Sequence, residues 1–394
     1  MSRAIPLSYS VRSAFQRRTR TLLTVAVMAL VVLAVTVMLS LATGIQRTLV
    51  TTGEPDNFIV LRKGATNDGA SMVPIEAYQT VRYFPGIAID AASGEPLVSP
   101  EMVVQPFFYR ADGGRENVLV RGIRPMAFAV HRNVRIVAGR APRSSAGEAL
   151  VGRGVAARYP GAVLGGDIRF GRREWKVVGI LDAGGSSFES EVWVDATDLW
   201  NDANRAVYSG LRVKLASSTE AAAFVRRVES DGRLALEAKP EIDYYREQSE
   251  SSSFLFGLTA GLALIMGVGA SFGAMNTMFA AVSSRTTEIG TLRALGFSRR
   301  SILVSFVAES LAIALAGFVI GTLAAVAATA AMTAVMNGVA VNLSTFSTAT
   351  VGVRVSAGNA LAAFVLAALL GLAGGLLPAR RAARLSPVDA LRRR

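Results

Sequence analysis

Four long stretches with almost no charge constrain this chain of 394 residues more than any other feature. A stretch of about 20 apolar residues is long enough to cross the hydrocarbon layer of a bilayer as a helix. Glu309 is the only charged residue in the four stretches. The pattern predicts an α-helical membrane protein with four transmembrane helices, one near the N-terminus and three near the C-terminus. We assign these helices to residues 22–42, 254–282, 301–335 and 359–378.

The first stretch could instead be the core of a cleaved signal peptide, because both follow a positively charged leader. The leader here carries five arginines, and the apolar run of 21 residues exceeds the core of about 7 to 15 residues in such signals. We therefore expect a retained span. Within the leader, residues 1–21, apolar side chains recur at helical spacing and predict an amphipathic helix on the membrane surface.

The net charge of +13 is unevenly distributed along the chain. Residues 43–253 hold 26 basic and 26 acidic side chains, so the excess lies in 1–21, 283–300 and 379–394. Because basic clusters beside span ends mark the cytoplasmic side, both termini and 283–300 should be cytoplasmic. A bacterial inner-membrane protein with 43–253 and the short loop 336–358 in the periplasm is expected. The arginines fit contact with anionic lipid of the bilayer, and no nucleic acid is expected.

Residues 43–253 are predicted to form a large extracytoplasmic α+β domain, inserted between the first and second spans. The chain has no cysteine, so this domain must be held by its own apolar core. Strand and helix patterns at 57–64 and 73–86 are repeated at 208–216, 218–230 and 233–240, which indicates two βαβ-like halves. A strand-rich insertion, about 90–205, separates them and includes a hairpin around Asp112-Gly113-Gly114.

The residues for catalysis are few, and the chain is not expected to be an enzyme. His131 is the only histidine and is expected to be a surface or cap residue. Glu189 and Glu191 should share one solvated face of a strand. No lysine stands in a P-loop pattern, no metal site is indicated, and this chain is expected to bind no cofactor. The glycines of 257–273 lie in a span and should serve close helix packing.

The basic segment 283–300 is too charged to cross the bilayer and too short to fold alone. Ile289, Leu292 and Leu295 recur every three residues, which is compatible with an irregular amphipathic helix. Gly290 and Gly296 each cost about 1 kcal/mol in a helix interior relative to alanine. These glycines either let another surface approach the backbone or end the helix before the next span. The alternative is an ordinary cytoplasmic loop that is basic for topological reasons alone.

The segment also resembles a known family. "RTTEIGTLRALGFSRRSILVSFVAES" is similar to the cytoplasmic coupling segment and following span of MacB/FtsX-type ABC transporter permeases, whose pattern is R-x-x-E-I-G-x-L-[RK]-A-[LI]-G. The stretches "RRTRTLLT", "ALVGRGVAARYPGAVLGGDIRFGRREWKVVGI" and "LPARRAARLSPVDALR" also match the family. The resemblance covers most of the chain.

The resemblance implies a permease that dimerises, most simply as a homodimer, and binds two copies of a separate ABC ATPase, which would hold ATP and Mg²⁺. ATP-driven motion would reach the periplasmic domain and drive export, with a membrane-fusion adaptor as a possible further partner. Lipoprotein release and regulation of a periplasmic partner without transport remain alternatives. The family pattern assigns the ATPase-coupling site to Arg285, Glu288, Ile289, Gly290, Leu292, Arg293, Leu295 and Gly296.

Glu309 lies about eight residues into the third span, roughly 12 Å deep. An ionised carboxylate at that depth is costly unless it faces a partner or water. One expectation is a structural role, in which Glu309 pairs with arginines near the cytoplasmic boundary or with the second copy of a dimer. The other is a direct role in transmitting motion within the membrane.

Overall fold

The computed structural model describes residues 18–110, 113–336, 339–342 and 348–386. It divides into a helical unit, residues 1–42, 254–331 and 354–394, and a sheet unit, residues 43–253 and 332–353. The amphipathic helix expected within 1–21 lies outside the described residues up to residue 17. The basic tail expected at 379–394 lies outside them from residue 387 onward. Each unit is described by itself below.

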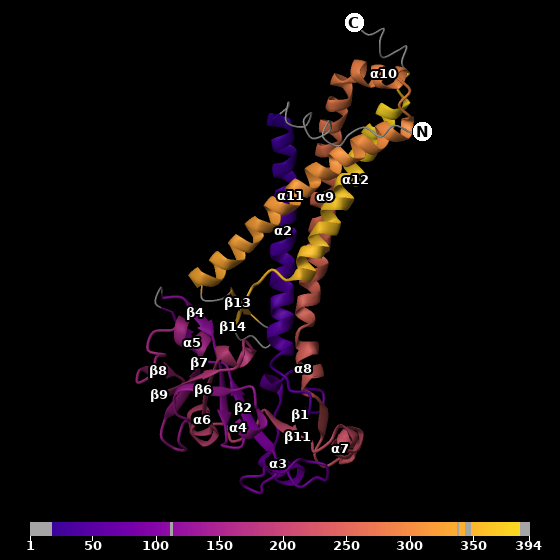
Figure 1. Ribbon diagram of the computed structural model, residues 1–394. Helices are drawn as coiled ribbons and strands as arrows, with labels where there is room; N and C mark the ends of the chain where they lie inside the picture. The colour runs from indigo at the N-terminus through magenta and orange to yellow at the C-terminus, as the bar shows by residue number, and fades with distance from the viewer. Residues whose placement is uncertain (1–17, 111–112, 337–338, 343–347, 387–394) are drawn as a thin grey trace. The chain divides into compact units, whose positions relative to one another are not determined.

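The helical unit is built from long helices (Figure 1), of which α9 and α11 are joined through the short helix α10. Four of its helices are long and apolar enough to cross a membrane. All four extend beyond the predicted spans, because backbone hydrogen bonding does not stop where hydropathy falls. The helices are α2 (Arg18–Val50), α9 (Glu250–Ser284), α10 (Thr286–Ala294), α11 (Arg299–Met336) and α12 (Ala357–Arg384).

Glycines bring the long helices together at several places. Gly317 and Gly321 of α11 lie against α2, so that a methyl group at Gly321 would come within 2.8 Å of Cβ of Val32. On α12, Gly371 receives a hydrogen bond on its carbonyl from Oγ of Ser310, at 2.6 Å. Of the glycines expected to pack within 257–273, only Gly267 has a side chain of another helix within 4 Å in the described chain. Spacing in the sequence cannot tell which glycines face a neighbour.

The sheet unit contains a ten-stranded mixed sheet in the order β12-β1-β11-β2-β5-β10-β7-β9-β6, with β8 paired to β9. Two pairs, β5 with β10 and β7 with β9, are parallel, and the other pairs are antiparallel. The strands are β1 (Asn57–Arg62), β2 (Val98–Val104), β5 (Leu119–Ile123), β6 (Arg135–Gly139), β7 (Glu148–Gly152), β8 (Asp167–Phe170), β9 (Arg173–Asp182), β10 (Glu191–Asp195), β11 (Gly210–Lys214) and β12 (Leu236–Pro240).

Two small hairpins lie outside this sheet. The first pairs β3 (Phe107–Tyr109) with β4 (Arg115–Asn117), which confirms the hairpin predicted around the Asp-Gly-Gly turn. The second pairs β13 (Val339–Asn342) with β14 (Thr348–Val351) inside the segment expected to be a plain loop. Its β-branched residues give it strand propensity that the prediction did not use.

Two interleaved βαβ units form one half of the sheet. In the first, α3 (Ile75–Val81) connects β1 to β2, and in the second, α7 (Ala221–Ser230) connects β11 to β12. In the sheet order β12-β1-β11-β2, β11 lies between β1 and β2, and β1 lies between β11 and β12. Each βαβ unit is therefore split by a strand of the other, as in ferredoxin-like folds. The two βαβ units confirm the two βαβ-like patterns predicted from the sequence, and together they are named the ferredoxin-like half. The predicted insertion, about 90–205, begins too early, because β2 belongs to the first βαβ unit and extends to residue 104.

The insertion half contains six strands of the sheet, β5, β6, β7, β8, β9 and β10. It also contains three short helices, α4 (Ala127–Val130), α5 (Arg153–Arg158) and α6 (Ala196–Ala203). In Figure 1, β6, β7, β8 and β9 lie together at one end of the sheet unit, away from β1, β11 and α7. Each half has its own apolar core: Phe58, Leu211 and Phe224 belong to the ferredoxin-like half, and Trp175 and Val192 to the insertion half. β2 is the strand that pairs with both halves.

β6 is the last strand of the insertion half. Its register on β9 shifts between Ile136 and Ala138, which leaves Val137 bulged and 53% exposed. Gly139 ends the strand with φ of +74°, a conformation that favours glycine. Arg135 at the other end is exposed.

Candidate functional site

The segment between α9 and α11 forms a short helix with a well-defined end. α10 spans Thr286–Ala294. After it, the N–H of Gly296 donates to the carbonyl of Arg293 at 3.2 Å, and the N–H of Phe297 donates to the carbonyl of Leu292 at 3.1 Å. This pair of bonds is a Schellman motif, which requires a left-handed residue, and Gly296 has φ of +92°. Gly296 therefore ends the helix, one of the two roles considered for it.

The inner face of α10 is fixed to the rest of the helical unit by Ile289. This side chain is 3% exposed and packs with Met278 and Val282 of α9, among others. Full burial of such a side chain stabilises by roughly 1.5–3 kcal/mol. The same apolar cluster contains residues of α11 and α12: Ile302, Phe306, Ala379, Ala382 and Ala383. α10 is thus packed against the ends of all three C-terminal long helices.

Gly290 is buried beside Ile289, so neither residue lies on the outward face of α10. The sequence pattern grouped them with Glu288 as one contact site, but helical geometry separates the two faces. The outward face carries exposed side chains, and Leu295 at its end is 67% exposed. Its members are Thr287, Glu288, Thr291, Ala294 and Leu295.

An ion pair ties the start of α10 to the first part of α11. Nη1 of Arg285 lies 3.4 Å from Oε2 of Glu309, and both side chains are largely buried. Glu309 thus has the arginine partner that the structural interpretation required. Because an unpaired charge inside a span is costly, each member of the pair holds the other in place.

Arg293 takes part in the turn that follows α10. Its Nη1 donates to the carbonyl of Phe297 at 3.0 Å. The side chain is half-buried, as is that of Leu292. Arg293 therefore stabilises the turn between α10 and α11 through a contact within this chain.

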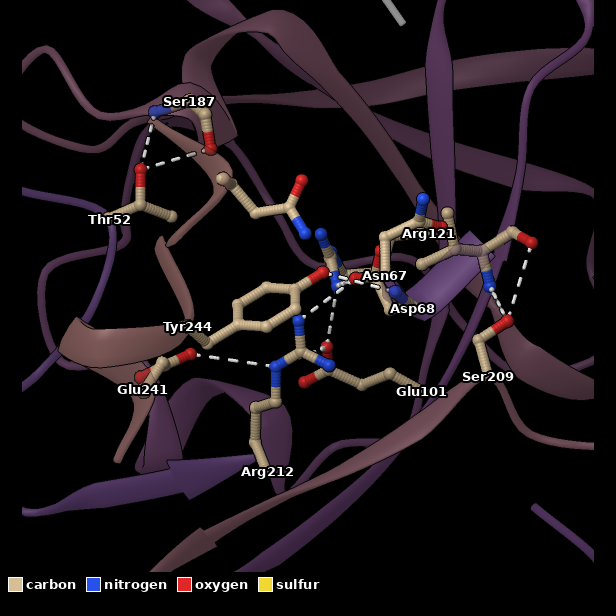
Figure 2. Close-up of polar contacts among 12 residues, drawn as sticks. Thr52, Asn67, Asp68, Glu101, Arg121, Ser187, Ser209, Arg212, Glu241 and Tyr244 are labelled. Atoms are coloured by element: carbon tan, nitrogen blue, oxygen red, sulfur yellow. Dashed lines mark hydrogen bonds and ion pairs between the residues drawn. The ribbon is translucent and has the colours of Figure 1, made fainter. Parts of the chain in front are cut away.

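The sheet unit holds a second concentration of charge, which the sequence did not reveal. Seven ionisable side chains, here named the buried charge cluster, are each at most 3% exposed. They are Asp68, Glu101, Arg121, His131, Glu191, Arg212 and Glu241, and Figure 2 shows most of them. The only early signal was a charge within otherwise apolar strands, as Arg121 in "LVRGI" and Arg212 in "GLRVK".

One prediction about this region is wrong, and another holds for only one of its two alternatives. His131 is the C-cap residue of α4, as one alternative had it, but it is fully buried rather than at the surface, with Nε2 2.6 Å from Oε1 of Glu101. Glu189 and Glu191 do not share a solvated face, because Glu189 lies in the 3₁₀ helix η2 (Ser187–Ser190). Glu191 is buried in β10 and binds Arg121 through two hydrogen bonds of 2.7 Å. Alternation along a strand predicts a face but not whether that face is covered.

The charges of the cluster stabilise one another. Burial by itself raises the pKa of Glu101, but the nearby His131, Arg212 and Arg121 outweigh it and hold that pKa well below its usual range. The pKa of Asp68 is likewise raised by burial but lowered overall by Arg212 and Arg121. Paired ions of this kind are compatible with a structural role. Over the described residues, no three His, Asp or Glu side chains lie together in a way that could hold a metal ion.

Comparison with known proteins covers nearly the whole described chain. Residues 21–231 match the model of the MacB-like periplasmic core domain, and residues 260–387 match that of the FtsX-like permease C-terminal domain. Two relatives are macrolide export ATP-binding/permease proteins MacB. The protein from Bdellovibrio bacteriovorus is 34% identical over 144 residues, and that from Bradyrhizobium diazoefficiens is 37% identical over 151 residues. These matches cover 36% and 38% of this chain but only about a fifth of either relative.

Two solved structures are similar to about half of this chain at low identity. The periplasmic region of MacB from Actinobacillus actinomycetemcomitans is 14% identical, with a TM-score of 0.38, over 48% of this chain and 91% of that one. The extracellular domain of the ABC-type transporter YknZ from Gram-positive bacteria is 15% identical, with a TM-score of 0.37, over 46% of this chain and 99% of that one.

Proposed function

The chain belongs to the MacB/FtsX-type family of ABC transporter permeases, and from this premise we propose that it is the membrane subunit of a MacB-type exporter. In this proposal, motion of a separate ABC ATPase is transmitted through the membrane helices to the sheet unit, which lies in the periplasm. The chain itself carries no catalytic residue of the reaction. ATP and Mg²⁺ would be held by the ATPase.

The observation that carries the proposal is the two-sided construction of α10. Its inward face is packed on α9, α11 and α12 through Ile289, and Arg285 pairs with Glu309 of α11. Its outward face presents Glu288, Thr291 and Leu295. A helix held this firmly moves together with the long helices, so force applied to its outward face would reach them without being absorbed by a flexible loop.

The assembly follows the same reasoning. We propose two permease copies and two ATPase copies, with each ATPase contacting one outward face of α10. Both termini would be cytoplasmic in a bacterial inner membrane. Export is favoured over lipoprotein release or regulation without transport because the matching relatives are named as macrolide export proteins. A periplasmic adaptor would then be the further partner.

The test is charge reversal on the outward face. Glu288→Lys should leave the fold intact, since the side chain is exposed. A like charge at an interface costs several kcal/mol, so stimulation of the partner ATPase should fall at least about tenfold. The measurement is ATP hydrolysis by the ATPase co-purified from its native membrane, with and without the permease.

The matched control is Glu229→Lys, the same change at an exposed position of α7 in the sheet unit. It should stimulate the ATPase as the unchanged protein does. Full stimulation by Glu288→Lys would show that the outward face of α10 is not the contact, and the proposal would be withdrawn.

A further inference from the structure

The buried charge cluster lies where the two halves of the sheet meet. The first part of β2 pairs with β11, ending at Glu101 opposite Gly210, and the second part pairs with β5, beginning at Met102 opposite Gly122. The Glu101 carboxylate therefore sits at the change of partner. It contacts Nη1 of Arg121 on β5 at 2.8 Å and Nε of Arg212 on β11 at 3.8 Å. One carboxylate thus faces a guanidinium from each half.

The two arginines are held very differently. Arg121 has two hydrogen bonds of 2.7 Å to Glu191 and one of 2.8 Å to Glu101. Arg212 has one hydrogen bond, of 3.0 Å, to Asp68 (Figure 2). Its Nε and Nη1 are buried without a hydrogen-bond partner in the described structure. Buried polar atoms are normally bonded, so the Arg212 side of the cluster is incompletely paired.

Glu241 is the carboxylate that faces the incompletely paired side. Its Oε1 lies 3.5 Å from Nε of Arg212, beyond good hydrogen-bond geometry, and is itself buried without a hydrogen-bond partner in the described structure. A donor and an acceptor of opposite charge therefore lie just apart in a fully buried region. A small displacement of either residue would let them bond, which is a property of a contact that can exist in two arrangements.

Glu241 is also the first residue of α8 (Glu241–Gln248), which directly precedes α9. Its Oε2 accepts from the N–H of Glu54, shortly after α2 ends, at 3.2 Å. The backbone at Gly53 is close to α8, because a methyl group there would lie 3.0 Å from the carbonyl carbon of Glu241. The chain segments that follow α2 and precede α9 are thus joined at Glu241.

The segment after α2 is bonded to the insertion half as well. Oγ1 of Thr52 accepts from the N–H of Ser187 at 2.9 Å (Figure 2). Oε1 of Glu54 accepts from the N–H of Asn133 at 3.0 Å. Residues 52–54 therefore contact both halves. They reach the ferredoxin-like half through Glu241, which faces Arg212, and through the ion pair of Glu54 with Lys214 of β11, at 3.7 Å.

We propose that the buried charge cluster is a conformational device that sets the angle between the two halves of the sheet according to the position of residues 52–54 and α8. Arg121 is the fixed member, and Arg212 is the positioning residue, which keeps Asp68 on Nη2 while its Nε gains or loses a bond to Glu241. The inference rests on the proposed function only for the source of movement. It assigns to the periplasmic part a pivot at Glu101 and a trigger at Glu241.

The test measures the distance between the halves in the full chain, reconstituted in lipid nanodiscs without an ATPase. The natural sequence has no cysteine, so spin labels can be attached through Arg169→Cys on β8 and Glu229→Cys on α7 without background labelling. Glu241→Gln removes the charge that faces Arg212 but keeps an acceptor for the Glu54 N–H. It should shift or broaden the distance distribution measured by pulsed electron paramagnetic resonance.

Glu247→Gln is the matched control, because it makes the same change on the exposed part of the same helix. It should leave the distribution as in the labelled parent. An identical distribution for Glu241→Gln and Glu247→Gln would overturn the inference. If Glu241→Gln does not accumulate, Arg212→Lys keeps the charge but loses the planar fork, and it should produce the same broadening. An unchanged distribution in Arg212→Lys would equally overturn it.

The outcomes separate this inference from the proposed function. A shifted distribution together with full ATPase stimulation by Glu288→Lys would leave the device in place and remove the ATPase contact at α10. An unchanged distribution together with lost stimulation would do the reverse.

Discussion

Arg121 shows how a single buried side chain can hold charges from distant parts of the chain. It bonds Glu191, 70 residues later, and Glu101, 20 residues earlier, and its guanidinium is also 5.3 Å from the ring centre of Phe188. Burial lowers its pKa, but the attraction of Glu191 and Glu101 outweighs burial and raises that pKa well above the usual value. Removing one member of such a group leaves uncompensated buried charge, which costs more than the pair contributes relative to apolar residues.

Arg121→Met should therefore destabilise the sheet unit by about 3–5 kcal/mol. Urea unfolding of the purified protein, followed by tryptophan fluorescence, reports this directly because Trp193 is buried and donates to Oε2 of Glu191 at 2.9 Å. Arg169→Met, at an exposed position of β8, is the matched control and should change stability by less than about 0.5 kcal/mol. Equal unfolding midpoints for the two variants would contradict a stabilising role of the cluster.

At the scale of elements, helix existence was predictable and helix contacts were not. Long apolar runs predict the long helices of the helical unit because one helix of about 20 residues matches the bilayer. The Schellman end at Gly296 was also within reach, since glycine is the residue expected there. In contrast, nothing in the sequence distinguishes Gly321 from Gly257. Gly321 packs on α2, whereas a methyl group placed on Gly257 would have no neighbour within 4 Å in the described structure.

That contrast gives a matched pair of variants. Gly321→Val should force α11 away from α2, because even its Cβ would come within 2.8 Å of Cβ of Val32. Overpacking of this kind costs about 1–3 kcal/mol. Gly257→Val changes helix propensity and hydropathy in the same way without that contact. Thermal unfolding in detergent should show a lower midpoint for Gly321→Val than for Gly257→Val, and the reverse order would mean that α2 and α11 are not held by this contact.

For the whole molecule, the sequence predicted the α+β class of the sheet unit, its two βαβ units and its insertion, because each depends on local patterns and chain order. It did not predict the buried charge cluster. Glu101 and Arg212 are more than a hundred residues apart, and the alternation rule places charged residues of strands toward solvent. The pairing of β2 with β11 brings their side chains together, and the pairing of β2 with β5 adds Arg121. The family motif likewise listed Ile289 and Glu288 together, whereas the helix buries Ile289 and leaves Glu288 exposed.

Topology is the prediction at this scale. The positive-inside rule places Ser284 in the cytoplasm and Asn133 in the periplasm. Alkaline phosphatase fused after Asn133 should be active, and a green fluorescent protein fused after Ser284 should fluoresce. Fluorescence at Asn133 with phosphatase activity at Ser284 would reverse the orientation of the protein. Fusions at Glu229, in the same predicted compartment as Asn133, serve as the internal check.

The irregular end of β6 bears on whether separate copies of the protein can join through their sheets. A regular strand at the end of a sheet offers unpaired N–H and C=O groups to any other chain, and sheets joined in this way grow into aggregates. On β6, the bulge at Val137 interrupts the row of groups, Gly139 bends its end, and Arg135 places a charge beside it. The β6 edge of the sheet is thus a poor template for pairing with another copy, which disfavours extension of the sheet into a fibre.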